Sequence, residues 1–241
     1  MTEDLRKRLD TLRAARGFLL PHHGALAAGA PALHEAYLRM YRALTVDERA
    51  LSPFARECVW LALLVVAEEG IGTHHIDLFL THGGTEDQAE ALIAMAGFCA
   101  GFDALAFAER SWSAQLSALD AGGAYLRALG ALNADRIPED LAELCMLCAQ
   151  AARGASAAVT LHLGRAYARG IPEPQMVEAL SYVIWPVGVN RFVEACESWH
   201  HLLQGGTVTP SAPFAVWADM PGMGAFDPEA GGAVGGFEAE P

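Results

Sequence analysis

The sequence repeats itself weakly, with an offset of 87 residues. Cys58 is matched by Cys145 and His75 by His162, because 145 − 58 and 162 − 75 are both 87. Across positions 55 to 112, 12 of the 58 residues recur, and several of them are rare types or turn glycines. The further matches include Thr73 with Thr160, Gly83 with Gly170, Glu86 with Glu173, Gln88 with Gln175, Gly101 with Gly188, and Ser111-Trp112 with Ser198-Trp199. An internal repeat of this length predicts two copies of one structural unit.

Composition favours helices over strands. The chain of 241 residues is 53% hydrophobic, so it can bury a sizeable core. Ala, Leu and Gly dominate while Ile and Thr are few, which predicts an all-α protein. We expect the two copies to be intertwined as one domain. The expected segments are an N-terminal helical segment (1–50), a first copy (51–119), a second copy (120–204) and an acidic tail rich in Gly and Pro (205–241).

Charge and hydropathy exclude several classes of partner. The formal charge of −13 disfavours binding to nucleic acid or to an anionic membrane surface. The longest apolar runs, 58–67 and 179–189, are about half of the roughly 20 residues that a membrane crossing needs. The charged N-terminal segment lacks the apolar centre of a signal peptide, and five cysteines are an odd number. We therefore expect a cytoplasmic protein with reduced thiols and no membrane association.

Start and stop signals place the helices of both copies. Ser52 and Pro53 begin a helix that is apolar nearly all round and extends to about Glu69. The other expected helices are Thr73–His82, about fifteen residues after Thr85, Phe102 to about Leu119, Pro138 to Gly154, Ser156–Ala168, a helix after Pro172, and Val189–Leu203. In each copy a long helix with an early Glu is thus followed by a glycine break and a helix with His.

This order of residues resembles the carboxymuconolactone decarboxylase and alkylhydroperoxidase-D-like superfamily, over roughly residues 17–203. The motif of that superfamily is E-x11-C-x2-C-x3-H-x7-G. The second copy matches this spacing with Glu143, Ala155, Ala158, His162 and Gly170. The first copy matches it with Glu57, His75 and Gly83, with one residue fewer between Glu and His. The chain is identified as a two-copy member that lacks the cysteine pair. The resemblance implies a duplicated helical unit and a homodimer or homotrimer.

The missing cysteines remove one chemistry and leave another. In the peroxidase members of the superfamily the two cysteines form a redox pair, so their absence excludes thiol peroxidase chemistry at this position. Glu and His remain, and they can transfer protons without a cofactor. The chain does contain a C-x2-C, Cys145 to Cys148, but in an apolar helix we expect those thiols to be core residues. A zinc site there would need two further ligands, and no second pair offers them.

The candidate catalytic residues are Glu57, Glu68 and His75 in the first copy and Glu143 and His162 in the second. The first copy is favoured because its titratable groups are denser, although the second copy keeps the motif spacing better. The alternatives are that both histidines are core residues and that Glu68, Glu69, His74 and His75 are a solvated helix terminus. The candidate substrate-binding residues are Trp60, His74, Phe98, Tyr182 and Trp185, and their aromatic rings are equally compatible with a core role.

The sequence therefore predicts a cofactor-independent acid–base enzyme: a lyase, decarboxylase or isomerase. The expected substrate is a small organic acid, a lactone or an aromatic-derived compound. The second hypothesis is a catalytically silent binding or scaffold protein of the same fold, and the third is thiol peroxidase-like activity through Cys145 and Cys148.

Overall fold

The computed structural model describes residues 2–220, and this part of the chain is all-α, with no strand. The prediction of an all-α protein is confirmed. The chain divides into two compact units, Met1–Asp47 and Glu48–Pro241. The predicted mobility of the tail from about position 221 lies outside the described residues.

The first unit contains α1 (Thr2–Arg16), α2 (Pro21–Gly29), α3 (Pro31–Tyr41) and a short π-helix, η1 (Arg42–Val46). A proline in the first turn begins both α2 and α3, where the missing N–H costs nothing. We expected one helix from Ala32 to Leu44, but the α-helix ends at Tyr41 and the chain continues in the wider π-turn. His23 and His34 are buried and join α2 to α3, with Nδ1 and Nε2 3.1 Å apart.

The second unit begins with α4 (Pro53–Val66), α5 (His74–Thr81), α6 (Glu86–Phe98) and α7 (Gly101–Trp112). Ser52 caps α4 by accepting a hydrogen bond from the backbone N–H of Ala55. Thr85 and Gln88 form a capping box at the start of α6. Both predicted start signals are confirmed.

The chain continues with α8 (Ala121–Asn133), α9 (Glu139–Arg153), α10 (Ser156–Ala168), α11 (Glu173–Ser181), the 3-10 helix η2 (Tyr182–Ile184), α12 (Val189–Gln204) and α13 (Ala212–Ala218). The helix that was predicted to reach Leu119 ends at Trp112, and α8 was not predicted. Its sequence, AGGAYLRALGALN, carries three glycines, which lower helix propensity. Asp120 begins it by accepting a hydrogen bond from the N–H of Gly123 at 2.7 Å.

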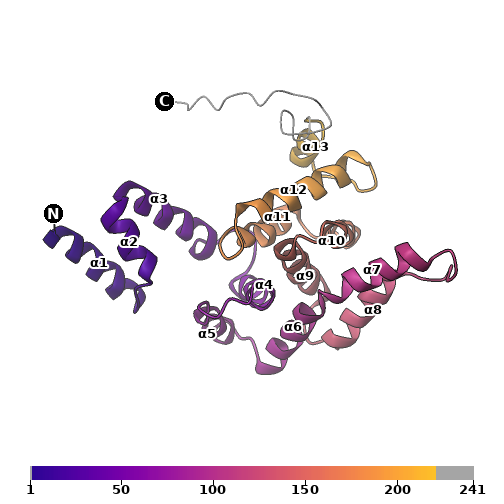
Figure 1. The fold of residues 1–241 in the computed structure, drawn as a ribbon, viewed down its shortest axis with the longest axis horizontal. Coiled ribbons are helices and arrows are strands. Elements are labelled where there is room, and N and C mark those ends of the chain that lie inside the picture. Colours follow the sequence, from indigo (N-terminus) through magenta and orange to yellow (C-terminus); the bar gives the residue numbers. More distant parts are fainter. Residues whose placement is uncertain (1, 221–241) are drawn as a thin grey trace. The chain divides into compact units, whose positions relative to one another are not determined.

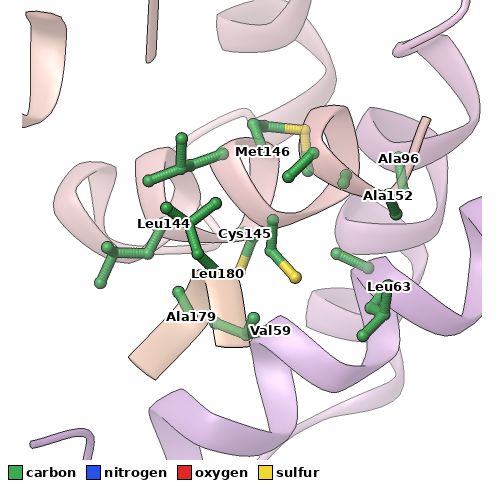
Figure 2. Close-up of a cluster of buried hydrophobic side chains, with 14 of the residues drawn as sticks. Val59, Leu63, Ala96, Leu144, Cys145, Met146, Ala152, Ala179 and Leu180 are labelled. Atoms are coloured by element: carbon green, nitrogen blue, oxygen red, sulfur yellow. The ribbon is translucent and has the colours of Figure 1, made fainter. Parts of the chain in front are cut away.

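The core of the second unit lies between α4 and α9, which pack against each other while α6 packs on α4 and α10 and α11 pack on α9 (Figure 1). Figure 2 shows side chains of α4, including Val59 and Leu63, facing Cys145 of α9 and Leu180 of α11. These four side chains are fully buried. Helices α4 and α9 are therefore rigid supports for any side chain that they present.

The helices α4 to α7 and α9 to α12 occur in the same order. Adding 87 to the residue numbers of α4 (53–66) gives 140–153, a range that lies within α9. Adding 87 to those of α7 (101–112) gives 188–199, a range that α12 covers from Val189 onward. The glycine breaks after α4 and α9 separate each long helix from the helix that carries the histidine. The first such helix, α5, is shorter than α10, which begins five residues earlier in the aligned numbering.

Two further features of the second unit are its last described helix, α13, and an internal apolar stretch. Phe214 and Trp217 of α13 pack on Trp199 of α12, with ring centroids 5.0 and 5.8 Å away, so these two aromatic residues dock α13 on α12. One helical stretch within residues 2–220, Glu86–Trp112, is long and apolar enough to cross a membrane by length and composition alone. Leu92, Met95 and Phe102 of this stretch are buried in the core.

Candidate functional site

The first Glu–His pair joins α4 to α5. Glu57 is fully buried, and its Oε2 lies 2.7 Å from Nδ1 of His75, which is itself 4% exposed. The neighbouring Arg56 donates from Nε to Oε1 of Glu57 at 2.9 Å. A buried carboxylate is costly without such partners, and here both oxygens have one. Arg56, which directly precedes Glu57 in the sequence, was one candidate partner for this buried carboxylate, and the structure pairs the two.

The turn between α4 and α5 brings His75 back onto α4. Glu68 takes a left-handed conformation, with φ of +51°, directly after α4 ends. The N–H of His75 then bonds to the carbonyl of Gly72 at 2.9 Å as α5 begins. A side chain at Gly72 would collide with Leu64 of α4, so the chain passes close to α4 here. The break therefore fixes the approach of the imidazole to Glu57.

Aromatic rings surround His75. Trp60, one turn after Glu57 on α4, stacks on the imidazole with centroids 4.3 Å apart and planes 14° apart. Tyr182 also stacks on Trp60, with centroids 5.1 Å apart, and the ring of His74 lies 4.2 Å from that of His75. Three of the five candidate substrate-binding residues are thus grouped around His75.

Two ring nitrogens of this group are available for further bonds. Nε2 of His75 makes no hydrogen bond to any residue in the described part of the chain. The indole N–H of Trp60 is buried and donates to no atom within residues 2–220. Native structures rarely leave a buried donor unsatisfied, and sites that bind ligands are a common exception.

The second Glu–His pair joins α9 to α10. Oε1 of Glu143 lies 2.5 Å from Nδ1 of His162, and Arg165 donates from Nε to Oε2 at 2.9 Å. Glu143 is 6% exposed and His162 1% exposed. Arg153 was a candidate partner for the buried Glu143, but its guanidinium instead bonds to Gln150 and Asp103. Arg165 takes its place because it lies on the same helix as His162, three residues later, and so on the same face.

Gly154 makes the second pair possible. It ends α9 with φ of +71°, a left-handed conformation that favours glycine, and a Cβ there would lie 2.0 Å from Nη1 of Arg191. The chain reverses at this point, so that α10 returns along α9. Both glycine breaks thus serve the same purpose, which is to bring an imidazole against a carboxylate of the preceding helix.

The two pairs differ at the outer nitrogen of the imidazole. Nε2 of His162 lies 3.3 Å from the hydroxyl of Tyr125 on α8. That hydroxyl also accepts a hydrogen bond from Nε2 of Gln150 at 2.8 Å and lies 3.6 Å from Sγ of Cys99. Burial raises the pKa of Tyr125 well above its usual value, so the phenol stays protonated. Whichever atom donates, both ring nitrogens of His162 already have a hydrogen-bond partner.

Hollows lie beside both motifs. A cavity of about 170 Å³ is lined by Glu143, His162 and Arg165 together with residues of α6 and α8. A second, of about 360 Å³, is mainly apolar and is lined by Glu68, Glu69 and parts of α4, α5 and α6. His75 does not line that second hollow, and no hydrogen bond or ion pair joins it to Glu68 in the described residues. The structure therefore pairs His75 with Glu57 and leaves Glu68 at a separate surface.

The remaining candidate residues are divided between the two pairs and the core. Phe98 stacks on Tyr125 with centroids 6.0 Å apart, so it lies beside the second pair rather than the first. Trp185 is half-buried and packs against the core. The hydroxyl of Tyr182 donates to Oε1 of Glu178 at 2.6 Å, which leaves its ring face to Trp60.

Four of the five cysteines are buried core residues, and Cys196 is half-buried. Cys145 and Cys148 are fully buried and unbridged, as predicted, and Cys145 lies among apolar side chains (Figure 2). Burial raises the pKa of both thiols, that of Cys58 to about 12 and those of Cys99 and Cys196 to about 11. Thiolates are the reactive form, so these thiols are poor nucleophiles. Within residues 2–220, no three His, Cys, Asp or Glu side chains are grouped to hold a metal ion.

Sequence reasoning missed Tyr125 and Arg165. Arg165 was detectable, since a cation three residues after His162 shares its helix face. Tyr125 was not, because α8 itself was unpredicted and its contact with α10 is distant in sequence. Comparison with known protein families, with curated proteins and with solved structures finds no match to this chain.

Proposed function

We propose that the protein is a cofactor-independent acid–base enzyme, a lyase, decarboxylase or isomerase, with His75 as the proton-transfer group and Glu57 as its partner. The substrate class is a small organic acid, a lactone or an aromatic-derived compound. The observation that carries the proposal is the state of the two imidazole nitrogens: Nδ1 of His75 is held by a buried carboxylate, and Nε2 has no partner in the described residues.

This arrangement suits a general base. Oε1 of Glu57 accepts from Arg56, and a carboxylate can only accept, so Nδ1 of His75 carries the proton of its hydrogen bond with Oε2. The lone pair is then on Nε2, where it can take a proton from a carbon or oxygen acid. The buried carboxylate stabilises the imidazolium that forms and fixes the ring orientation, as in other carboxylate–histidine pairs.

The aromatic residues around His75 supply the rest of the site. Trp60 covers one face of the imidazole and prevents the ring from turning. Its indole N–H lacks an acceptor among residues 2–220, and an oxygen of a substrate would provide one. A hydrogen bond from Trp60 to a carbonyl or carboxylate would stabilise negative charge that develops on proton removal.

In this proposal the second pair has a structural role. Its imidazole has the same carboxylate partner, but its Nε2 is occupied by Tyr125. Glu143, His162 and Arg165 join α9 to α10 through buried polar contacts. Glu143 and His162 would be the second-copy equivalents of Glu57 and His75, retained for folding.

We also propose that the two halves are copies of an alkylhydroperoxidase-D-like unit. The equal helix order of α4 to α7 and α9 to α12 supports this, as does a Glu–His contact across the glycine break in each half. We further propose a homodimer or homotrimer, the assembly that the resemblance implies, and a cytoplasmic location, as expected from the sequence. Large exposed apolar side chains on α5 to α7, among them Ile76, Leu80, Ile93 and Phe107, are consistent with association.

The alternative is a catalytically silent binding or scaffold protein. The occupied Nε2 of His162 favours it for the second half of the chain. Thiol peroxidase-like activity through Cys145 and Cys148 is the third proposal, and the burial of both thiols disfavours it.

A panel of lactones and β-keto acids tests the enzyme proposal with the variants His75→Gln and His162→Gln. We expect His75→Gln to lower turnover at least 100-fold, the usual contribution of a general base, and His162→Gln to lower it less than tenfold. Circular dichroism of each variant shows whether the helices are intact. Equal turnover by wild type and His75→Gln would overturn the mechanism, and absence of turnover by wild type across the panel would favour the scaffold.

A further inference from the structure

The cavity beside the second Glu–His pair is suited to a ligand of its own. It measures about 170 Å³, and cavities of about 150 Å³ in proteins can hold benzene. Apolar side chains of three helices, α6, α8 and α9, form one wall: Met95, Leu126, Leu129, Ala142 and Met146. Methionine side chains adapt their shape to a ring or a branched chain. The cavity therefore accepts an apolar body of about one ring.

The charged groups at the cavity are mostly carboxylates. Asp135, Glu139 and Glu143 line it, against one guanidinium, that of Arg165. Arg165 is paired with Glu143 at 2.9 Å, and Glu139 is paired with Arg169, whose Nη2 lies 2.7 Å away. Asp135 has no ion pair or hydrogen bond with any residue in the described part of the chain. One unmatched negative charge therefore remains at the cavity.

The backbone holds Asp135 in place. Ala134 and Asp135 are both left-handed, with φ of +46° and +61°, conformations that cost free energy in residues other than glycine. The side chain of Asn133 bonds to both the N–H and the carbonyl of Ile137, at 2.9 and 2.8 Å, and so closes the loop. Arg136, the nearest cation in sequence, is committed to Asp87 and to backbone carbonyls. The loop thus holds Asp135, which is exposed, among the residues that line the cavity.

We propose that this cavity binds a small organic cation, a primary amine on an apolar body of about one ring. The ammonium group would pair with Asp135, and the apolar body would lie between Met95 and Met146. An amine is favoured over a carboxylic acid because the one guanidinium at the cavity is already matched and the one unmatched group is negative. This site is independent of the proposed catalysis at His75.

Binding of three isosteric probes tests the proposal: benzylamine, benzyl alcohol and benzoate at pH 8. The readout is the NMR shift of ¹³C-labelled methionine methyl groups. Benzylamine should shift the methyls of Met95 and Met146, while that of Met176, buried on α11 outside the cavity, should stay unchanged. Benzylamine should bind at least fivefold more tightly than benzyl alcohol, and benzoate should bind more weakly than either.

Asp135→Asn removes the charge with little effect on the fold, because Asn tolerates the left-handed conformation at least as well as Asp. We expect it to weaken benzylamine binding at least fivefold and to leave benzyl alcohol unchanged. Asp77→Asn, at an exposed carboxylate on α5, is the matched control and should have no effect. The proposal is overturned if benzoate binds as tightly as benzylamine, if Asp135→Asn binds benzylamine as wild type does, or if no methyl at the cavity shifts.

Discussion

Replacing Tyr125 with Phe isolates the contact that distinguishes the two imidazoles. The ring of Tyr125 is fully buried against Phe98 and Phe102, and Phe keeps those contacts, so no large cavity is created. Only the hydroxyl is lost. With it go the bond from Gln150 at 2.8 Å, the bond with Nε2 of His162 at 3.3 Å and the weaker contact with Sγ of Cys99 at 3.6 Å.

The magnitude follows from what each former partner retains. Gln150 still donates to the carbonyl of Cys99 at 3.1 Å, so the loss there is about 1 kcal/mol, the net worth of one hydrogen bond. Nε2 of His162 has no other partner within residues 2–220, and leaving a buried polar atom unpaired costs about 1–3 kcal/mol. We therefore expect Tyr125→Phe to lower the free energy of unfolding by about 2–4 kcal/mol in total.

Urea unfolding measures this change, with an unaltered m-value showing that both states are otherwise the same. A double-mutant cycle with His162→Gln isolates the contact between the two side chains, and we expect a coupling energy of about 1 kcal/mol. If Tyr125→Phe costs less than about 0.5 kcal/mol and the coupling is zero, Tyr125 does not hold His162. The claim that the second imidazole is occupied would then be wrong.

Three further predictions concern the thiols, α13 and assembly. The pKa of Cys58 rises from 9.0 to about 12 and that of Cys196 from 9.0 to about 11 on folding, so the unfolded chain loses these protons first. The contribution of these protonated thiols to the free energy of unfolding is fully present below pH 9 and should be lost between pH 9 and 12. Urea unfolding across this range should show a smaller decline in that free energy for Cys196→Ala than for wild type. Trp217→Ala removes the packing on Trp199 and should expose residues 205–220 to limited proteolysis, with cleavage at wild-type rates as the contrary result. Light scattering should give two or three times 25.6 kDa, and a mass of one chain would contradict the proposed oligomer.

The helical plan was predictable where local signals agree. Ser52 and Thr85 both cap helices, and both positions follow from residue type and spacing. The apolar pattern of α4 and α9 predicted their burial in the same way. The failure at α8 has an equally local cause, since glycines at 122, 123 and 130 weaken the helical pattern and only packing on α6 and α7 compensates.

The candidate site was predictable only in part. The pairing of Glu57 with His75 follows from a repeated motif, and Arg56 follows from the cost of burying a carboxylate. Glu68 was grouped with His75 because the two are close in sequence. The left-handed turn at Glu68 directs its side chain to another hollow, and a single residue with positive φ has no reliable signal in one sequence unless it is glycine.

The difference between the two halves arises outside the repeated motif. In each half a long helix presents a carboxylate, a turn brings back an imidazole, and an arginine donates a hydrogen bond to the carboxylate. These shared contacts cannot make one half reactive and the other inert. The deciding group is the hydroxyl of Tyr125, which belongs to α8, between the two matched segments. That hydroxyl occupies Nε2 of His162, whereas nothing in the described residues occupies Nε2 of His75. His75 can therefore exchange a proton with a ligand directly, while His162 would first have to break its hydrogen bond with Tyr125.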